Sequence, residues 1–148
     1  MAVSRKKVVL IDSNVVVYSL NSSHKYFEQA LSVYEQVCAG EFKGVLAQQN
    51  LLEVYRVLTH SKYQNPMTPQ EAIRSIGTYL DVCTLIYPSL TTAQNALNLV
   101  VENDLRGNQI FDAYLYSVAV ENGVGTLYTA NEKDFFYVSK IEVFNPFG

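Results

Sequence analysis

The chain has 148 residues, of which 49% are hydrophobic and 17% charged, and its formal net charge is −3 at pH 7. This hydrophobic content is enough for a continuous core, so the composition excludes a disordered chain, and the length predicts one domain, residues 1–148. The net negative charge argues against a module that coats nucleic acid through a global basic field. It leaves open an enzyme that holds its substrate through a metal ion.

The N-terminal segment begins with the basic run Arg5, Lys6 and Lys7, which we expect to be a solvated lead-in to the first strand. The next apolar run, 8–11, ends at Asp12 and is too short for a signal peptide or a membrane span. A cytoplasmic protein is therefore expected.

The two cysteines, Cys38 and Cys83, are the only ones in the chain and belong to no CxxC motif. No His lies near either of them in the sequence. We expect both to be buried, reduced packing residues.

Short apolar runs alternate along the chain with stretches of helical spacing. Strands are predicted at 8–11, 45–47, 85–87, 126–129 and 141–144. Apolar residues at helical spacing, expected to face the core, occur at 27–38, 51–58, 72–80, 93–101 and 111–119. The predicted order is βα, βαα, βα, βα, β. The two consecutive helices are expected to be separated near Asn65 and Pro66, with Pro69 in the first turn of the second helix. Strands alternating with helices predict a three-layer α/β/α fold around a central parallel sheet of about five strands.

Acidic side chains stand close to the ends of these strands. Asp12 follows the first strand directly, Glu53 lies in the first turn of the helix after the second strand, and Asp112 lies in the first turn of the helix before the fourth. Ligands of open α/β sheets bind beyond the carboxyl ends of the strands, so the three acids are expected at one edge of the sheet. Each acid alone has a purely structural interpretation, as a helix cap or a first-turn charge. Their joint placement favours a functional site.

Three crowded carboxylates repel one another, which would raise the pKa of at least one of them. A hard cation relieves this repulsion. Because the candidate ligands are oxygen atoms, with no suitably placed His or Cys, the sequence predicts Mg²⁺ or Mn²⁺ rather than zinc.

Four segments together resemble the PIN-domain family, and the likeness extends over about 8–146. They are 8–15 (VVLIDSNV), the helix that carries Glu53, 110–115 (IFDAYL) and 127–135 (LYTANEKDF). Small members of this family are often VapC-type ribonuclease toxins of toxin–antitoxin modules. The resemblance implies a Mg²⁺- or Mn²⁺-dependent endoribonuclease that hydrolyses RNA phosphodiester bonds and has a cognate antitoxin.

The resemblance also assigns roles to individual residues. Asp12, Glu53 and Asp112 would be the catalytic residues and would hold the metal, directly or through water. Ser13 and Asn14 would brace these acids, and Thr129 would set the loop after the fourth strand. A homodimer is implied through the region 51–79, which carries Tyr55, Tyr63 and Tyr79.

One position departs from the family pattern, because Asn131 stands where an Asp is usual. Asn keeps an oxygen but loses a charge, so a second metal site, if there is one, would be weaker. Asp134 either compensates as a ligand or caps the short turn before Phe135. The alternative hypothesis, supported by Asn131 and the low positive charge, is a catalytically weak PIN-like domain that binds RNA or a protein.

Overall fold

A computed structural model describes residues 6–148 and confirms the predicted three-layer α/β/α fold. The elements are β1 (Val8–Ile11), α1 (Ser13–Ser19), α2 (Phe27–Cys38), β2 (Lys43–Ala47), α3 (Gln48–Thr59), α4 (Pro69–Leu80), β3 (Thr84–Ile86), α5 (Thr92–Asn103), α6 (Gln109–Glu121), β4 (Thr126–Tyr128), a 3₁₀ turn η1 (Glu132–Phe135) and β5 (Glu142–Phe144). The five strands form one parallel sheet in the order β3-β2-β1-β4-β5.

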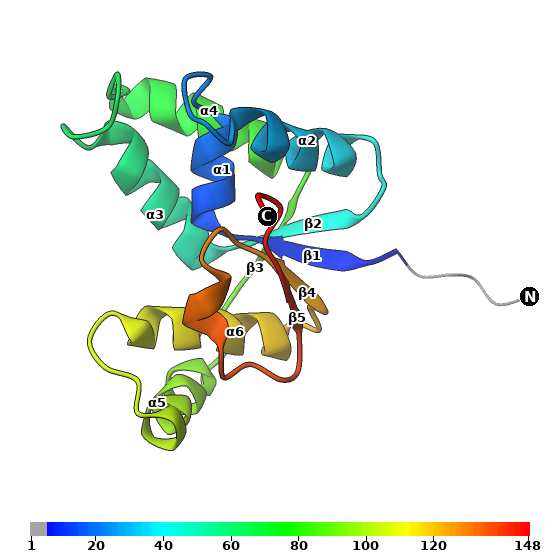
Figure 1. Ribbon diagram of the computed structural model, residues 1–148, viewed down its shortest axis with the longest axis vertical. Coiled ribbons are helices and arrows are strands. Elements are labelled where there is room, and N and C mark those ends of the chain that lie inside the picture. The colour runs from blue at the N-terminus through cyan, green and yellow to red at the C-terminus, as the bar shows by residue number, and fades with distance from the viewer. Residues whose placement is uncertain (1–5) are drawn as a thin grey trace, which may run out of the picture.

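Helices cover both faces of this sheet. In Figure 1, α1 to α4 lie on one side of the strands and α5 and α6 on the other. Side chains of β1 alternate accordingly, since Val9 and Ile11 pack with α1 to α4 whereas Leu10 packs against α6. The strand is buried on both faces, which explains why its sequence is an uninterrupted apolar run.

The register of the central strands fixes which residues meet at the carboxyl edge. Ile11 of β1 pairs with Tyr128 of β4, and the backbone N–H of Asp12 donates to the carbonyl of Tyr128 at 2.9 Å. Asp12 and Thr129, which are 117 positions apart in the chain, therefore leave the sheet side by side.

The predicted order of elements was wrong in three places. Two helices, not one, follow each of β1 and β3, and only the turn η1 separates β4 from β5. The unpredicted helix α1 is rich in β-branched residues, which disfavour helix in isolation. It forms because the Asp12 side chain accepts from the N–H of Ser13 at its start and because Val15, Val16 and Val17 are buried in the core.

The helix α2 buries only part of its predicted apolar face. Its buried residues are Ala30, Val33 and Val37, whereas Cys38 is exposed at the last position of the helix. The prediction that Cys38 is buried was therefore wrong, because the helix turns that position towards solvent. Cys83 is buried as predicted, and both thiols are free.

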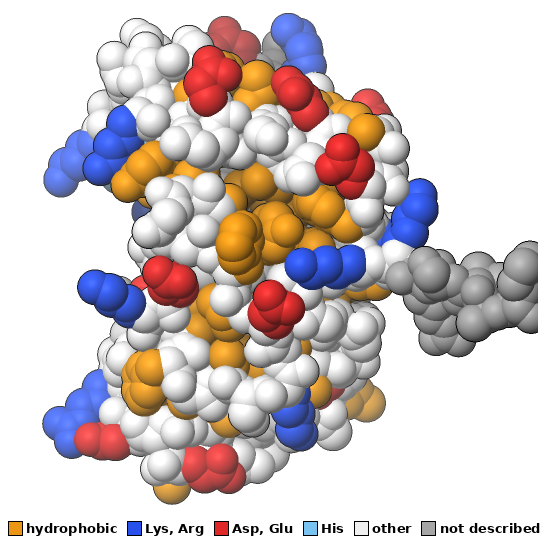
Figure 2. All heavy atoms as spheres, turned by 45° about the vertical axis from the view of Figure 1, so that its right-hand side comes forward, with side chains coloured by type: hydrophobic (Ala, Val, Ile, Leu, Met, Phe, Trp, Pro, Cys, Tyr) orange, Lys and Arg blue, Asp and Glu red, His pale blue; other side chains and the backbone are white. Residues whose placement is uncertain are grey.

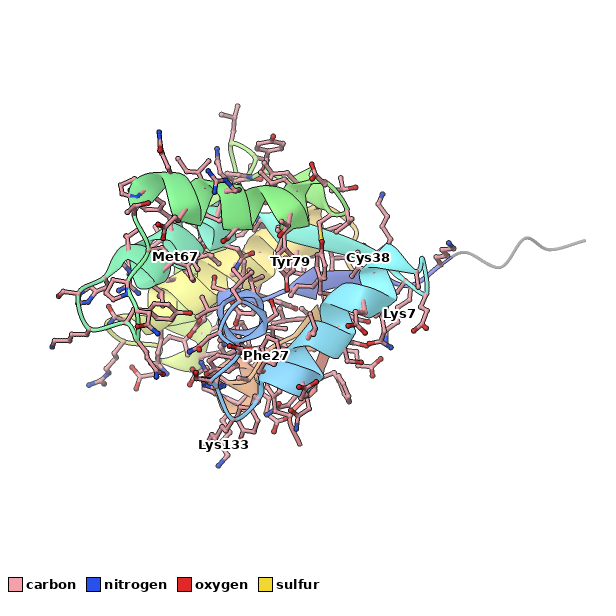
Figure 3. All side chains as sticks on the ribbon, turned by 90° about the horizontal axis from the view of Figure 1, so that it is seen from above. Lys7, Phe27, Cys38, Met67, Tyr79 and Lys133 are labelled. Carbon is pink, nitrogen blue, oxygen red and sulfur yellow. The ribbon has the colours of Figure 1, made fainter. Side chains whose placement is uncertain are left out.

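The faces of the other helices also differ from the periodic prediction. Several of the apolar residues expected in the core are exposed, namely Leu52, Ile73, Leu80, Leu97, Val101 and Phe111. Tyr79, in contrast, is 1% exposed and points inward from α4, where its hydroxyl group pairs with that of Ser19 in α1. Figure 3, which labels Tyr79, shows α1 nearly end-on between α2 and α4.

Arg5 of the basic run lies outside the described residues, and Lys6 and Lys7 are exposed, as expected for a solvated lead-in. Within residues 6–148, no helix combines the length and the apolar character that a membrane span needs.

Candidate active site

Asp12 occupies the carboxyl end of β1 and is held by short hydrogen bonds. Its Oδ1 accepts from the backbone N–H of Ser13 at 2.8 Å, and its Oδ2 accepts from Thr129 Oγ1 at 2.8 Å and from Asn14 Nδ2 at 3.4 Å. The residue is only 9% exposed. Burial raises its pKa to about 6, although the hydrogen bonds from Thr129 and Ser13 oppose this change. The side chain of Asp12 is thus fixed in orientation, and burial disfavours its ionised form.

Ser13 and Asn50 connect Asp12 to Glu53. Ser13 Oγ donates to Glu53 Oε2 at 2.8 Å and accepts from Asn50 Nδ2 at 3.0 Å. Asn50 Nδ2 also lies 3.4 Å from Asp12 Oδ1, while its Oδ1 accepts from the N–H of Ala47 at 2.9 Å. The fully buried Asn50 therefore has both ends of its amide satisfied.

Sequence analysis did not identify Asn50 or Gln49 as part of the site. The available signal was the polar run Gln48-Gln49-Asn50 directly after β2, at the edge where ligands bind. Gln49 Nε2 donates to Glu53 Oε1 at 2.8 Å and to the carbonyl of Phe111 at 3.2 Å. Both oxygens of Glu53 consequently have a donor.

Asp112 lies in the first turn of α6 and is half-buried. Burial raises its pKa to about 7, and the charges of Asp134, Asp12 and Glu53 add to the effect. The acids are thus close enough to influence one another electrostatically. Among residues 6–148 the carboxylate of Asp112 accepts no hydrogen bond from a side chain or cap.

The segment after β4 places its two candidate ligands differently. Asn131 is exposed, and its backbone N–H donates to Thr129 Oγ1 at 3.1 Å, but its side chain makes no hydrogen bond with any described residue. Asp134, in the turn η1, is also exposed, yet its charge is the one that most affects the pKa of Asp112. Asp134 therefore acts electrostatically on Asp112, whereas Asn131 carries no charge with which to do so.

The donor set fits a hard divalent cation. It consists of carboxylate oxygens without a positive partner, because the only ion pair between described residues joins Arg106 to Asp104. Within residues 6–148, no group of three or more His, Cys, Asp or Glu side chains is arranged so that it could hold a metal ion as it stands. Binding a cation between these carboxylates would relieve the repulsion between their charges.

A cleft of about 810 Å³ opens beside Glu53 and Asp112. Its lining includes Gln49, Glu53 and Arg56 from α3 and Phe111 and Asp112 from α6. Arg56 is the only Lys or Arg among the lining residues, and Phe111 is 58% exposed. The cleft thus places the guanidinium group of Arg56 and the aromatic ring of Phe111 next to the carboxylates of Glu53 and Asp112.

Charges elsewhere do not form a field of one sign. Figure 2 shows a face on which Lys and Arg side chains alternate with Asp and Glu, and hydrophobic side chains lie exposed across its middle. This face therefore offers a polyanion no continuous positive field.

Comparison with known proteins gave a family and a set of related folds. A family model described as PIN domain matches residues 9–141, whereas curated proteins gave no match. A structure of VapBC2 from Rickettsia felis, bound to a DNA fragment from its promoter, has a TM-score of 0.68 at 18% identity and covers 93% of this chain and 98% of that chain.

Two further solved structures are similar. VapC20 from Mycobacterium tuberculosis, described as a Sarcin-Ricin loop cleaving toxin, has a TM-score of 0.66 at 13% identity and covers 88% of this chain and 96% of its own. VapBC-1 from nontypeable Haemophilus influenzae has a TM-score of 0.66 at 17% identity and covers 94% of this chain and 98% of its own. At these identities the likeness establishes the fold.

Proposed function

The chain belongs to the PIN domain family, and from this premise we propose that it is a metal-dependent endoribonuclease and the toxin of a toxin–antitoxin module. The observation that carries the proposal is the approach of Asp12, Glu53 and Asp112 at one edge of the sheet, with the pKa of Asp12 and of Asp112 raised. The similar folds of a toxin described as cleaving the Sarcin-Ricin loop and of VapBC complexes support the same reading.

Asp12, Glu53 and Asp112 would hold Mg²⁺ or Mn²⁺, with Asp134 as a further ligand and with Asn131, which lacks a charge, as a weaker one. When bound, the cation would activate water for in-line attack and neutralise charge on the phosphate. The protein's own part is orientation. Thr129 and the N–H of Ser13 fix the carboxylate of Asp12, whereas Asp112 is free to adjust.

Arg56 and Phe111 support RNA as the substrate of this cleft. A guanidinium group pairs well with a backbone phosphate, and an exposed aromatic ring offers a stacking surface for an unpaired base. Their position beside the acids would bring a phosphodiester bond to the catalytic residues.

For the assembly we infer a homodimer and a cognate antitoxin. The expected contact region, α3 and α4, exposes Leu52, Ile73 and Leu80. Tyr79 cannot contribute, because it is buried within the monomer, and Tyr55 and Tyr63 pack against the core. The aliphatic side chains are therefore the better candidates for the interface.

The decisive experiment is cleavage of a mixed RNA pool by wild type and by Asp12→Asn, in Mg²⁺ and in Mn²⁺. We expect cleavage that requires metal and is lost in the variant. RNA or protein binding by wild type, without cleavage in either metal, would contradict the nuclease and favour the catalytically weak binding module instead.

A further inference from the structure

We propose that Gln49 is a positioning residue that sets the separation of Glu53 and Asp112 by linking the two helices that carry them. This inference rests on the proposed nuclease function, because it concerns the same acids. Gln49 lines the cleft, but the proposed role is exerted through Glu53 and the start of α6.

The side-chain amide of Gln49 joins two layers of the fold. One hydrogen of Nε2 points to Glu53 Oε1 in α3, at an N···O distance of 2.8 Å, and the other to the carbonyl oxygen of Phe111 in α6, at 3.2 Å. Phe111 directly precedes Asp112. Because α3 and α6 cover opposite faces of the sheet (Figure 1), they can meet only around its edge. No other hydrogen bond between described residues joins α3 to α6.

The orientation of this amide is determined by its partners. A carboxylate oxygen and a backbone carbonyl are both acceptors, so only the NH₂ end of Gln49 can face them. The opposite end, Oε1, is buried and has no hydrogen-bond partner among residues 6–148. Leaving a buried acceptor unpaired costs free energy. The amide therefore keeps an arrangement that is unfavourable for itself but holds Glu53 and α6 in place.

Glu53 depends on this contact for its orientation. Its Oε2 accepts from Ser13 Oγ and its Oε1 from Gln49 Nε2. Without Gln49, the carboxylate would keep one donor and could rotate about it, and the start of α6 would lose its tie to α3. Groups that orient metal ligands typically contribute about 10- to 100-fold to metal affinity or activity.

The test compares wild type with Gln49→Met, which keeps the bulk of the side chain but removes its hydrogen bonds, and with Gln49→Ala. Gln29→Ala is the matched control, because Gln29 is an exposed glutamine of α2 that does not line the cleft and makes no side-chain hydrogen bond with a described residue. Mn²⁺ binding to the metal-free proteins is measured by calorimetry, and RNA cleavage is measured at saturating Mn²⁺. Circular dichroism checks that each variant is folded.

We expect the Kd for Mn²⁺ to rise about 10-fold in both Gln49 variants, and kcat to fall about 10- to 100-fold with KM for RNA nearly unchanged. Gln29→Ala should match wild type. Wild type that binds Mn²⁺ and cleaves RNA, with Gln49→Met equal to it, would overturn the role of Gln49 alone. Wild type that neither binds Mn²⁺ nor cleaves would overturn the nuclease function and the role of Gln49 together.

Discussion

Two carboxyl groups in this protein, Asp12 and Asp112, lose a proton less readily than a solvent-exposed aspartate. Burial is the main cause for both, which brings their pKa to about 6 and about 7. At these two groups, the folded metal-free protein therefore binds more protons than the unfolded chain between about pH 4 and pH 7. Under these conditions the free energy of unfolding decreases as pH rises.

We accordingly expect the protein in EDTA to be more stable at pH 5 than at pH 8. Urea unfolding at several pH values measures this, and saturating Mn²⁺ should reduce the difference because the cation compensates the carboxylates. Stability that increased steadily over the same pH interval in EDTA would contradict the assigned shifts.

Asp112→Asn removes a carboxylate whose pKa is raised and which accepts no hydrogen bond from a described residue. At pH 8 in EDTA, we expect the free energy of unfolding to increase by roughly 1–2 kcal/mol, less than the full pKa change implies because the side chain is only half-buried. Mn²⁺ should no longer stabilise the variant. Asp104→Asn, at the exposed ion pair with Arg106, is the control and should change stability little. Asp12→Asn is less suitable, since it disturbs the contacts with Ser13 and Thr129.

Asp134 and Asn131 are distinguished by charge, because only Asp134 acts electrostatically on Asp112. Because the charge of Asp134 influences Asp112 and the Asn131 side chain makes no hydrogen bond with a described residue, we expect Asp134→Asn to weaken Mn²⁺ binding several-fold. Asn131→Ala should change it less. Calorimetry on both variants decides, and the reverse ranking would assign the fourth ligand to Asn131.

At the scale of elements, the cleft is formed where the start of α6 faces α3 across the edge of the sheet. Arg56 and Phe111 stand on these two helices beside the acids. We expect Arg56→Ala to raise KM for RNA, with kcat less affected. The slope of log affinity against log salt concentration should fall by about one, as expected for the loss of one phosphate contact.

Phe111→Ala should also raise KM, but with little change in salt dependence, because stacking involves no phosphate. Lys43→Ala serves as the control for both, since Lys43 is exposed at the amino end of β2, away from the acids. Equal loss of affinity in Arg56→Ala and Lys43→Ala would point to general charge rather than to the cleft.

At the scale of the whole molecule, the exposed aliphatic side chains of α3 and α4 bear on assembly. Ile73 is 63% exposed, so Ile73→Lys should not disturb the monomer fold but should weaken a dimer formed through α4. Analytical ultracentrifugation at micromolar concentration should give a dimer for wild type and a shift towards monomer for the variant. A monomeric wild type would contradict the proposed assembly.

The sequence alone determined the fold class and the edge at which the acids stand. Apolar runs such as Val8–Ile11 are buried on both faces, and parallel strands place their carboxyl ends together, so Asp12 could be located without coordinates. The helix that starts at Pro69 was also predictable, because its cap Thr68 and its N3 residue Glu71 form a local signal.

Only the tertiary structure decided what depends on contacts between distant segments. Helix α1 forms despite its valines because the core buries them. Leu52, Ile73 and Phe111 are exposed, although they are apolar residues at the helical spacing that predicts a buried face. The roles of Asn50 and Gln49 follow from hydrogen bonds to residues of other elements, which no local pattern encodes. Periodicity specifies which residues share a helix face, but the packing of neighbouring elements determines how much of that face is covered.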